Sequence, residues 1–226
     1  MKSLNSICMA ALLALGVGAP VRGAPTWTEG VNYFLVQPAR PAATLPPGKV
    51  QVTEVFSYAC PACNVFRPSM RKLVQTLPAN AVIDYLPATF NPSEDWPMFA
   101  LAYRTAQVLG VADNTHESMY DAVWSSRELA VIDASNRIRS PLPTIEDAAK
   151  FYNKSAGVPV DKFLATSKSF TVDLKMRSDE GLLRAYGIDR TPTIIVNGKY
   201  RVHVQSAGGD EPLLELVKWL VAKEIK

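Results

Sequence analysis

A Cys-Pro-Ala-Cys motif that directly follows an apolar segment is the feature that most restricts how this 226-residue chain folds. Residues 50–56 (VQVTEVF) are rich in β-branched and aromatic side chains, which predicts a buried strand. From Cys63 onward, apolar residues recur at three- and four-residue spacing, which predicts a helix that packs back on the strand. This stripe consists of Val65, Phe66, Met70, Leu73, Val74 and Leu77. The pattern places Cys60 at the N-terminus of a helix.

That position predicts redox chemistry for the two cysteines. The first backbone N–H groups of a helix have no intrahelical partner, and the helix dipole is positive there, so a thiolate is favoured over a thiol. We therefore expect Cys60 to have a lowered pKa and high reactivity near neutral pH. Cys63 lies one turn deeper, where it can attack a mixed disulfide on Cys60 or close the Cys60–Cys63 bridge. Pro61 and Ala62 complete the motif.

Three other uses of the motif fit the sequence less well. A zinc site needs about four ligands, and the rest of the chain offers only Cys8, His116 and His203, which are widely separated. Haem attachment requires a histidine after the second cysteine, where this chain has Asn64. A purely structural disulfide is rarely placed at a helix N-terminus after a strand. The redox interpretation is therefore preferred.

Residues 1–23 have the pattern of a secretory signal peptide. An early lysine precedes an apolar run from Ile7 to Val17, which is too short to span a membrane, and small residues precede a cleavage point after Gly23. Cys8 lies in this segment and is expected to be removed with it. The mature chain then keeps one close cysteine pair, which is not a framework of stabilising disulfides.

Composition narrows the choice of partners. Removal of residues 1–23 leaves 22 basic and 21 acidic residues, so the charge does not suggest a nucleic-acid partner. No other long apolar run is present, and we expect a soluble mature protein. The motifs require neither a cofactor nor a metal ion.

Glu54 is predicted to lie on the apolar side of the first strand. It shares the two-residue period of Val50, Val52 and Phe56, and a carboxylate at such a position is unfavourable unless it is paired or protonated. An exposed edge position or a salt bridge would be the ordinary explanation. The preferred hypothesis is that Glu54 donates and accepts protons beneath the cysteine pair.

The rest of the chain predicts a mixed α/β fold. Residues 33–36 and 81–86 read as strands, the second parallel to 50–56 because a helix connects them. Residues 91–186 read as helices, with a loop over 127–143 and a capping box at Thr144 and Asp147.

The C-terminal part of the chain predicts a hairpin and a final helix. Asn197-Gly198 separates two β-type runs, the second extending to Val204, and a last helix starts at Pro212. Both histidines, His116 and His203, are predicted to face solvent, because each lies in a polar context.

This order of elements resembles the thioredoxin fold, and most closely the DsbA family of periplasmic disulfide oxidases. The resemblance covers essentially the whole mature chain and is carried by WTEGVNYF at 27–34, Glu54 before FSYACPAC, the helical block, Pro68, and Thr191-Pro192 before the hairpin. It implies a thioredoxin fold with an inserted helical domain. The thioredoxin-like parts would be residues 24–90 and 187–226, and the insertion residues 91–186.

The resemblance also implies roles for individual residues. Cys60 would be the exposed nucleophile and Cys63 the buried resolving cysteine. Pro192 would be cis and face the disulfide, with Thr191 before it, and Glu54 would exchange protons with Cys63. A DsbA-like protein would be a periplasmic monomer that acts on unfolded or newly exported proteins with cysteines, and a membrane partner of the DsbB type would reoxidise it.

Two departures from the family pattern affect these expectations. The best-known members have a histidine at the position of Ala62, so a milder oxidant is expected here. The strand at 81–86 lacks the lysine that often accompanies the buried glutamate. A reductase or isomerase of the same fold is an alternative, although the dimerisation segment of two-domain isomerases is missing. A thioredoxin-fold copper chaperone is an alternative from another class.

Overall fold

A five-stranded sheet forms the centre of the protein. The computed structural model describes residues 26–41 and 45–225; the predicted signal peptide and Cys8 lie outside the described residues. The strand order is β1-β5-β4-β2-β3, in which β2 and β3 are parallel and the other pairs antiparallel. The strands are β1 (Phe34–Leu35), β2 (Val50–Phe56), β3 (Ala81–Pro87), β4 (Thr193–Val196) and β5 (Tyr200–His203).

Helices α1 (Pro61–Thr76) and α8 (Asp210–Glu224) pack on one face of this sheet. The buried residues of α1 are Cys63, Phe66, Met70 and Leu73, which share a core with Val50 and Val52 of β2 and with the apolar face of α8. The predicted stripe was wrong at two positions, since Val65 and Val74 are 74% and 41% exposed. The buried face of α1 is therefore narrower than the sequence pattern.

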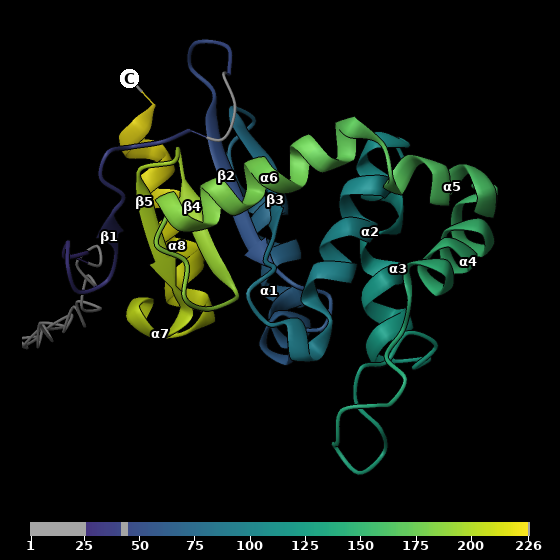
Figure 1. Ribbon diagram of the computed structural model, residues 1–226. Helices are drawn as coiled ribbons and strands as arrows, with labels where there is room; N and C mark the ends of the chain where they lie inside the picture. The colour runs from purple at the N-terminus through teal and green to yellow at the C-terminus, as the bar shows by residue number, and fades with distance from the viewer. Residues whose placement is uncertain (1–25, 42–44, 226) are drawn as a thin grey trace, which may run out of the picture.

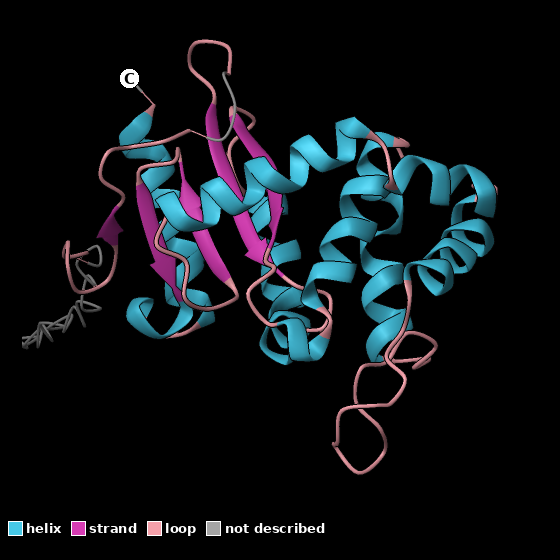
Figure 2. Ribbon diagram, in the orientation of Figure 1, coloured by secondary structure: helices cyan, strands magenta, loops and turns pink. Residues whose placement is uncertain are grey.

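Six helical segments lie between β3 and β4 and form a block beside the sheet (Figures 1 and 2). Helix α6 runs from this block back across the front of the sheet in the view of Figure 1. The capping box predicted at Thr144 and Asp147 begins α4. The segments are η1 (Pro92–Glu94), α2 (Trp96–Val108), α3 (Ala112–Trp124), α4 (Ile145–Ala156), α5 (Val160–Ser167) and α6 (Phe170–Ala185). The domain boundaries given above remain predictions.

The block and the sheet share a second apolar core. It contains Val55 and Ile195 from the sheet, whose side chains lie opposite those of the first core, together with aromatic residues of the helices such as Phe99, Tyr103 and Tyr120. Because alternate residues of β2 point to opposite faces, all seven of its residues are buried. The end of β2, where the cysteine motif follows, is thus enclosed from both sides.

The hairpin from β4 to β5 has the predicted Asn-Gly turn. Asn197 and Gly198 have φ values of 54° and 64°, the left-handed conformation that an Asn-Gly turn requires, and the Lys199 N–H donates to the Val196 carbonyl at 3.0 Å. The resulting register pairs Val196 with Tyr200 and Thr193 with His203. The second strand ends one residue earlier than predicted, because Val204 begins the short helix α7 (Val204–Ala207).

Both histidines are buried, which contradicts the prediction that they face solvent. His116 is 8% exposed, bonds through Nδ1 to the Tyr58 hydroxyl at 3.0 Å, and lies on the face of α3 that packs against aromatic rings. His203 is 7% exposed; the centre of its ring lies 6.0 Å from that of Phe34, and its Nδ1 atom lies 3.1 Å from the hydroxyl oxygen of Thr193 on the neighbouring strand. For both histidines, polar neighbours in the sequence did not indicate that the side chain itself is exposed.

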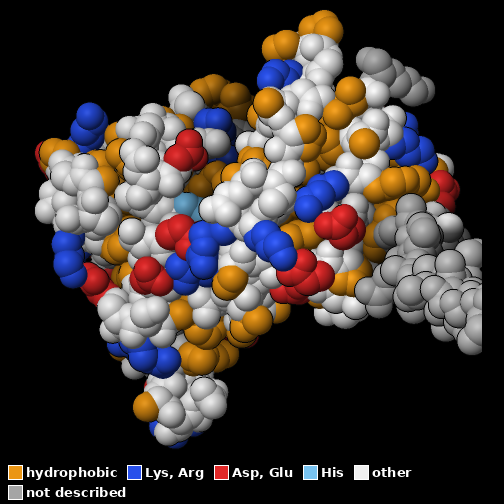
Figure 3. Space-filling view, turned by 180° about the vertical axis from the view of Figure 1, so that it is seen from behind, with side chains coloured by type: hydrophobic (Ala, Val, Ile, Leu, Met, Phe, Trp, Pro, Cys, Tyr) orange, Lys and Arg blue, Asp and Glu red, His pale blue; other side chains and the backbone are white. Residues whose placement is uncertain are grey.

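The surface carries mixed charges. Figure 3 shows acidic and basic side chains interspersed with apolar ones over the rear face of the molecule. Among the described helices, none has both the length and the apolar character needed to cross a membrane.

Candidate functional site

Cys60 is the N-cap of helix α1. It has extended backbone angles (φ −76°, ψ 117°), and its sulfur accepts a hydrogen bond from the Cys63 N–H at 3.2 Å. Pro61 occupies the first helical turn, where its missing N–H group is not needed. The turn is held from the other side by the Cys60 N–H, which donates to the Ser57 carbonyl at 3.1 Å. The Cys63 N–H, which has no partner within the helix, therefore points at the Cys60 sulfur.

The two cysteines, which are free thiols in this structure, differ strongly in acidity. The pKa of Cys60 is lowered to about 7, first because Cys63 donates a hydrogen bond to its sulfur, and further by hydrogen bonds from Thr191 and the backbone, while burial opposes the change. The pKa of Cys63 is raised, first by burial and then by its contact with the Cys60 thiolate. Cys60 is therefore partly ionised near neutral pH, and the thiolate of the pair lies on Cys60 and not on Cys63.

Thr191 lies directly against Cys60, and Pro192 follows it in the chain. The Thr191 hydroxyl donates to the Cys60 sulfur at 3.1 Å, and the Thr191 carbonyl oxygen is 3.7 Å from the same sulfur. The Thr191–Pro192 peptide bond is cis. Cys60 is only 4% exposed and Cys63 is 0% exposed, so Cys60 is not the freely exposed cysteine that the family resemblance implies. Pro61 and Ala62, by contrast, are exposed beside it.

Glu54 is buried on β2, beneath the cysteine motif. Its exposed fraction is 3%, and it lies opposite Tyr85 in the parallel pairing with β3. Burial raises the pKa of Glu54 to about 8, with smaller contributions from the charges of Glu117 and Cys60. Among the described residues, no side chain forms an ion pair or hydrogen bond with its carboxyl group. Near neutral pH, Glu54 can therefore either hold or release a proton.

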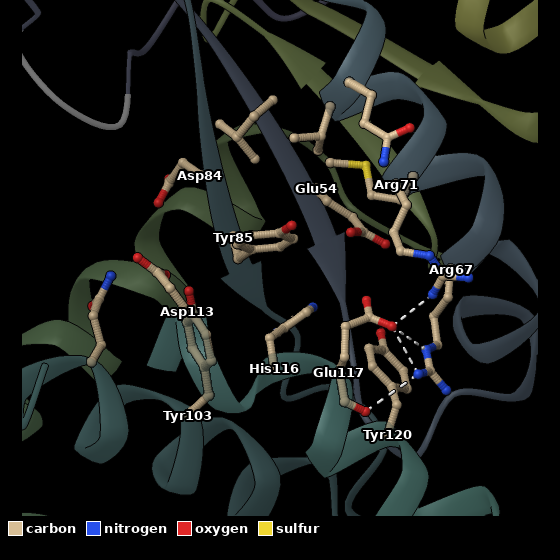
Figure 4. A pocket seen from close by; sticks show the side chains of 15 residues that line it. Glu54, Arg67, Arg71, Asp84, Tyr85, Tyr103, Asp113, His116, Glu117 and Tyr120 are labelled. Atoms are coloured by element: carbon tan, nitrogen blue, oxygen red, sulfur yellow. Dashed lines mark hydrogen bonds and ion pairs between the residues drawn. The ribbon is translucent and has the colours of Figure 1, made fainter. Parts of the chain in front are cut away.

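A cavity of about 550 Å³ connects Glu54 with the surface (Figure 4). Its walls come from α1, β3, α2 and α3, and Glu54 reaches it from β2. In the close-up, the Glu54 carboxyl group points into the space between α1 and Tyr85. The remaining lining residues are Arg67, Met70, Arg71, Val74, Gln75, Ile83, Asp84, Tyr85, Tyr103, Gln107, Asp113, His116, Glu117 and Tyr120.

The cavity is also lined by Arg67, Glu117 and Tyr120, which no motif in the sequence indicated as parts of the site. Arg67 of α1 donates to Glu117 at 2.8 Å and to Asp121 at 3.1 Å, and so ties the cysteine helix to α3. Its guanidinium lies 5.0 Å from the centre of the Tyr120 ring. The Tyr120 hydroxyl is buried and has no hydrogen-bond partner among the described residues. The apolar spacing of the two helices in the sequence predicts an exposed cation at Arg67 and an ordinary core residue at Tyr120.

The described residues contain no group of three or more His, Cys, Asp or Glu side chains arranged to hold a metal ion. The site offers instead a dithiol at a helix N-terminus, a hydroxyl that contacts the outer sulfur, and a buried carboxyl group with a raised pKa. These are the groups needed for thiol–disulfide exchange with proton transfer.

Comparisons with known proteins give the same assignment. The family model described as Thioredoxin matches residues 46–213. The thiol:disulfide interchange protein DsbA of Pseudomonas aeruginosa is 32% identical over 225 residues, which is 99% of this chain and 97% of that protein. The crystal structure of the oxidoreductase DsbA from Xylella fastidiosa superposes with a TM-score of 0.75 at 30% identity, covering 89% of this chain and 98% of that one. For a crystal structure of Pseudomonas aeruginosa DsbA, the TM-score is 0.72 at 32% identity, with 88% and 94% covered.

These similarities extend over almost the full length of both chains. They confirm the predicted thioredoxin fold with an inserted helical domain. The chain is a thiol:disulfide oxidoreductase and belongs to the DsbA family.

Proposed function

We propose that this protein donates the Cys60–Cys63 disulfide to exported proteins and so supports their oxidative folding. The observation that carries the proposal is the geometry at Cys60, whose sulfur accepts hydrogen bonds from the Cys63 N–H at 3.2 Å and from the Thr191 hydroxyl at 3.1 Å, so that a Cys60 thiolate is stabilised. A low thiol pKa makes Cys60 a good leaving group, and it stabilises the reduced protein relative to the disulfide. Both effects favour donation of the disulfide.

The reaction begins when a substrate thiolate attacks the Cys60 sulfur of the disulfide. The Cys60–Cys63 bond breaks, a substrate–Cys60 mixed disulfide forms, and Cys63 departs as a thiolate. A second substrate thiolate then attacks the substrate sulfur of the mixed disulfide and displaces Cys60 as a thiolate. Two electrons have passed from the substrate to the protein, and the substrate has gained a disulfide.

Glu54 is proposed to supply the proton that Cys63 needs. Because the pKa of Cys63 is raised, its departing thiolate takes up a proton near neutral pH. Glu54 lies close enough for its charge to raise the pKa of Cys63 and holds a proton up to a pH of about 8. The cavity of Figure 4 would let Glu54 recover its proton from solvent.

Thr191 and Pro192 are proposed to bind the substrate next to Cys60. The Thr191 backbone is adjacent to the reacting sulfur, and Pro192 has no N–H group that would pair with the rest of the sheet. An extended substrate segment could pair with this backbone as an added strand. Pro61 and Ala62 would form the exposed rim of the same site.

The setting proposed for this reaction is the periplasm. Residues 1–23 would direct export, and the mature protein would act as a soluble monomer, without a cofactor or nucleic acid, on unfolded or newly exported proteins with cysteines. A membrane protein of the DsbB type would reoxidise the cysteines. Residues 24–90 and 187–226 would form the thioredoxin-like unit around the inserted residues 91–186.

The decisive measurement is the reduction potential of the Cys60–Cys63 pair, obtained by equilibration with glutathione. We expect a clearly more oxidising potential than that of thioredoxin, about −270 mV. The Ala62→His variant is the matched comparison and should be more oxidising still. A wild-type value near thioredoxin's would rule out disulfide donation and would favour the alternative of a reductase. Faster repair of a scrambled test protein than oxidation of a reduced one would favour an isomerase.

A further inference from the structure

A hydrogen-bonded relay of two buried residues lies behind the Thr191–Pro192 loop. Thr193, the first residue of β4, pairs in register with His203, the last residue of β5. The His203 Nδ1 atom is 3.1 Å from the Thr193 hydroxyl oxygen, and this hydroxyl donates to the Arg190 carbonyl at 2.8 Å. The exposed fractions are 7% for His203 and 0% for Thr193. A buried histidine in a relay of this kind was not expected from the sequence.

The direction of the relay follows from the number of protons available. The Thr193 hydroxyl has one proton, which it gives to the Arg190 carbonyl, so it must accept a hydrogen bond from His203. His203 therefore carries a proton on Nδ1 and donates to Thr193. The backbone N–H of His203 in turn donates to the Ser206 hydroxyl at 3.3 Å, which anchors the histidine to α7.

The last step of the relay, from the Thr193 hydroxyl to the Arg190 carbonyl, spans the residue that contacts Cys60. Arg190 and Thr193 stand on either side of Thr191 and Pro192, and a hydrogen bond between them closes this short turn at its base. On its open side, the turn presents the Thr191 hydroxyl to the Cys60 sulfur at 3.1 Å. A turn closed in this way can hold Thr191 at a fixed distance from the sulfur.

We propose that His203 is a positioning residue, which acts through Thr193 and the Arg190 carbonyl to hold Thr191 in contact with the Cys60 sulfur. The inference rests on the proposed role of Cys60 as the reacting cysteine. Since a hydrogen bond to a thiolate stabilises it relative to the thiol, loss of the relay should weaken the thiolate and make the disulfide less oxidising. His203 does not itself touch the reacting atoms.

The test compares substitutions that remove the relay with ones that preserve it. Thr193→Val keeps the shape of the side chain but removes the hydroxyl, whereas Thr193→Ser keeps the hydroxyl. His203→Leu removes the donor, whereas the amide of His203→Asn can place an N–H group near the position of Nδ1. For each variant, the Cys60 thiolate is titrated by its ultraviolet absorbance, the equilibrium with glutathione is measured, and thermal unfolding shows whether the protein is folded.

We expect Thr193→Val and His203→Leu to raise the pKa of Cys60 and to shift the glutathione equilibrium about fivefold toward the oxidised protein, since a hydrogen bond to a charged group is weakened. Thr193→Ser and His203→Asn should stay close to wild type. If folded Thr193→Val and His203→Leu keep the wild-type pKa of Cys60, the proposal is wrong. It is also wrong if Thr193→Val and Thr193→Ser shift the pKa of Cys60 equally. The titration of Cys60 does not depend on the direction of electron flow, so it tests the relay even where the wild-type potential contradicts disulfide donation.

Discussion

Glu54 and Asp179 are two carboxylic acids with the same burial and opposite surroundings. Each is 3% exposed. Asp179 of α6 accepts two hydrogen bonds from Arg104 of α2, at 2.6 and 2.7 Å, and so joins two helices of the inserted block. Glu54 of β2 lies beneath the cysteines and, among the described residues, has no such partner. Burial raises the pKa of both acids, and only at Asp179 does a cation oppose the rise.

This difference shows how the protein separates stability from chemistry. A buried carboxylate with a two-pronged arginine partner keeps its charge and holds a fixed geometry. A buried carboxyl group without a partner is destabilising when charged, but its pKa of about 8 allows it to exchange a proton near neutral pH. The thioredoxin-like part of the protein thus carries the unfavourable acid, at the place where a proton is needed.

The largest expected change in stability comes from breaking the ion pair between Asp179 and Arg104. Asp179→Ala leaves Arg104, which is 6% exposed, as a buried and unpaired charge. We expect the free energy of unfolding to fall by about 3–5 kcal/mol in urea denaturation at pH 6. Asp173→Ala is the matched control, because it breaks an exposed ion pair with Arg177 on the same helix and should cost about 1 kcal/mol or less. Equal losses in the two variants would show that burial does not distinguish these pairs.

The next largest effect is expected at Glu54, where substitution should raise the free energy of unfolding instead of lowering it. The pKa of Glu54 is about 8 in the folded protein against an ordinary value of 4.5, so the folded state binds more protons than the unfolded state between these pH values. Stability of the wild type should therefore fall with rising pH across this window, by up to about 1.4 kcal/mol per pH unit. Glu54→Gln lacks this loss and should be more stable by about 2 kcal/mol at pH 6.

The Glu54→Gln comparison is made on reduced protein by denaturation at several pH values. The difference in stability between wild type and variant should be near zero at pH 4 and grow toward pH 8. The same variant should slow the step in which Cys63 changes protonation, as seen in stopped-flow reduction and reoxidation. A constant stability difference across the range, together with unchanged rates, would mean that Glu54 is an ordinary buried side chain.

The smallest change in stability is expected at the Tyr120 hydroxyl, a neutral buried group. The Tyr120 hydroxyl lies in the wall of the Glu54 cavity and has no hydrogen-bond partner among the described residues. Tyr120→Phe removes an unsatisfied buried polar atom and keeps the ring beneath Arg67, so we expect a gain of about 1 kcal/mol in the free energy of unfolding. A loss of similar size would show that the hydroxyl is satisfied in solution, and would place Tyr120 with Asp179 among the paired groups.

Local patterns were sufficient to predict much of the fold. The strand before the Cys-x-x-Cys motif, the N-cap position of Cys60, the capping box at Thr144 and the Asn197-Gly198 hairpin each depend on residues within one turn or one strand of each other. Such features are set by backbone geometry and by the side to which a side chain points, and both can be read from the order of residues. The prediction that Glu54 is buried was also correct, although the two-residue period did not single it out, because all seven residues of β2 are buried.

The order of the elements and the place of Cys60 at the start of α1 thus follow from local sequence patterns. What surrounds these groups depends on the tertiary structure, which also buries both faces of β2. It placed Thr191 within 3.1 Å of a sulfur 131 residues away, paired Asp179 with Arg104 while leaving Glu54 without a cation, and buried His116 and His203 despite their polar neighbours in sequence. The physical reason is that pKa values and hydrogen bonds depend on distance and desolvation in space, and chain segments far apart in sequence supply both.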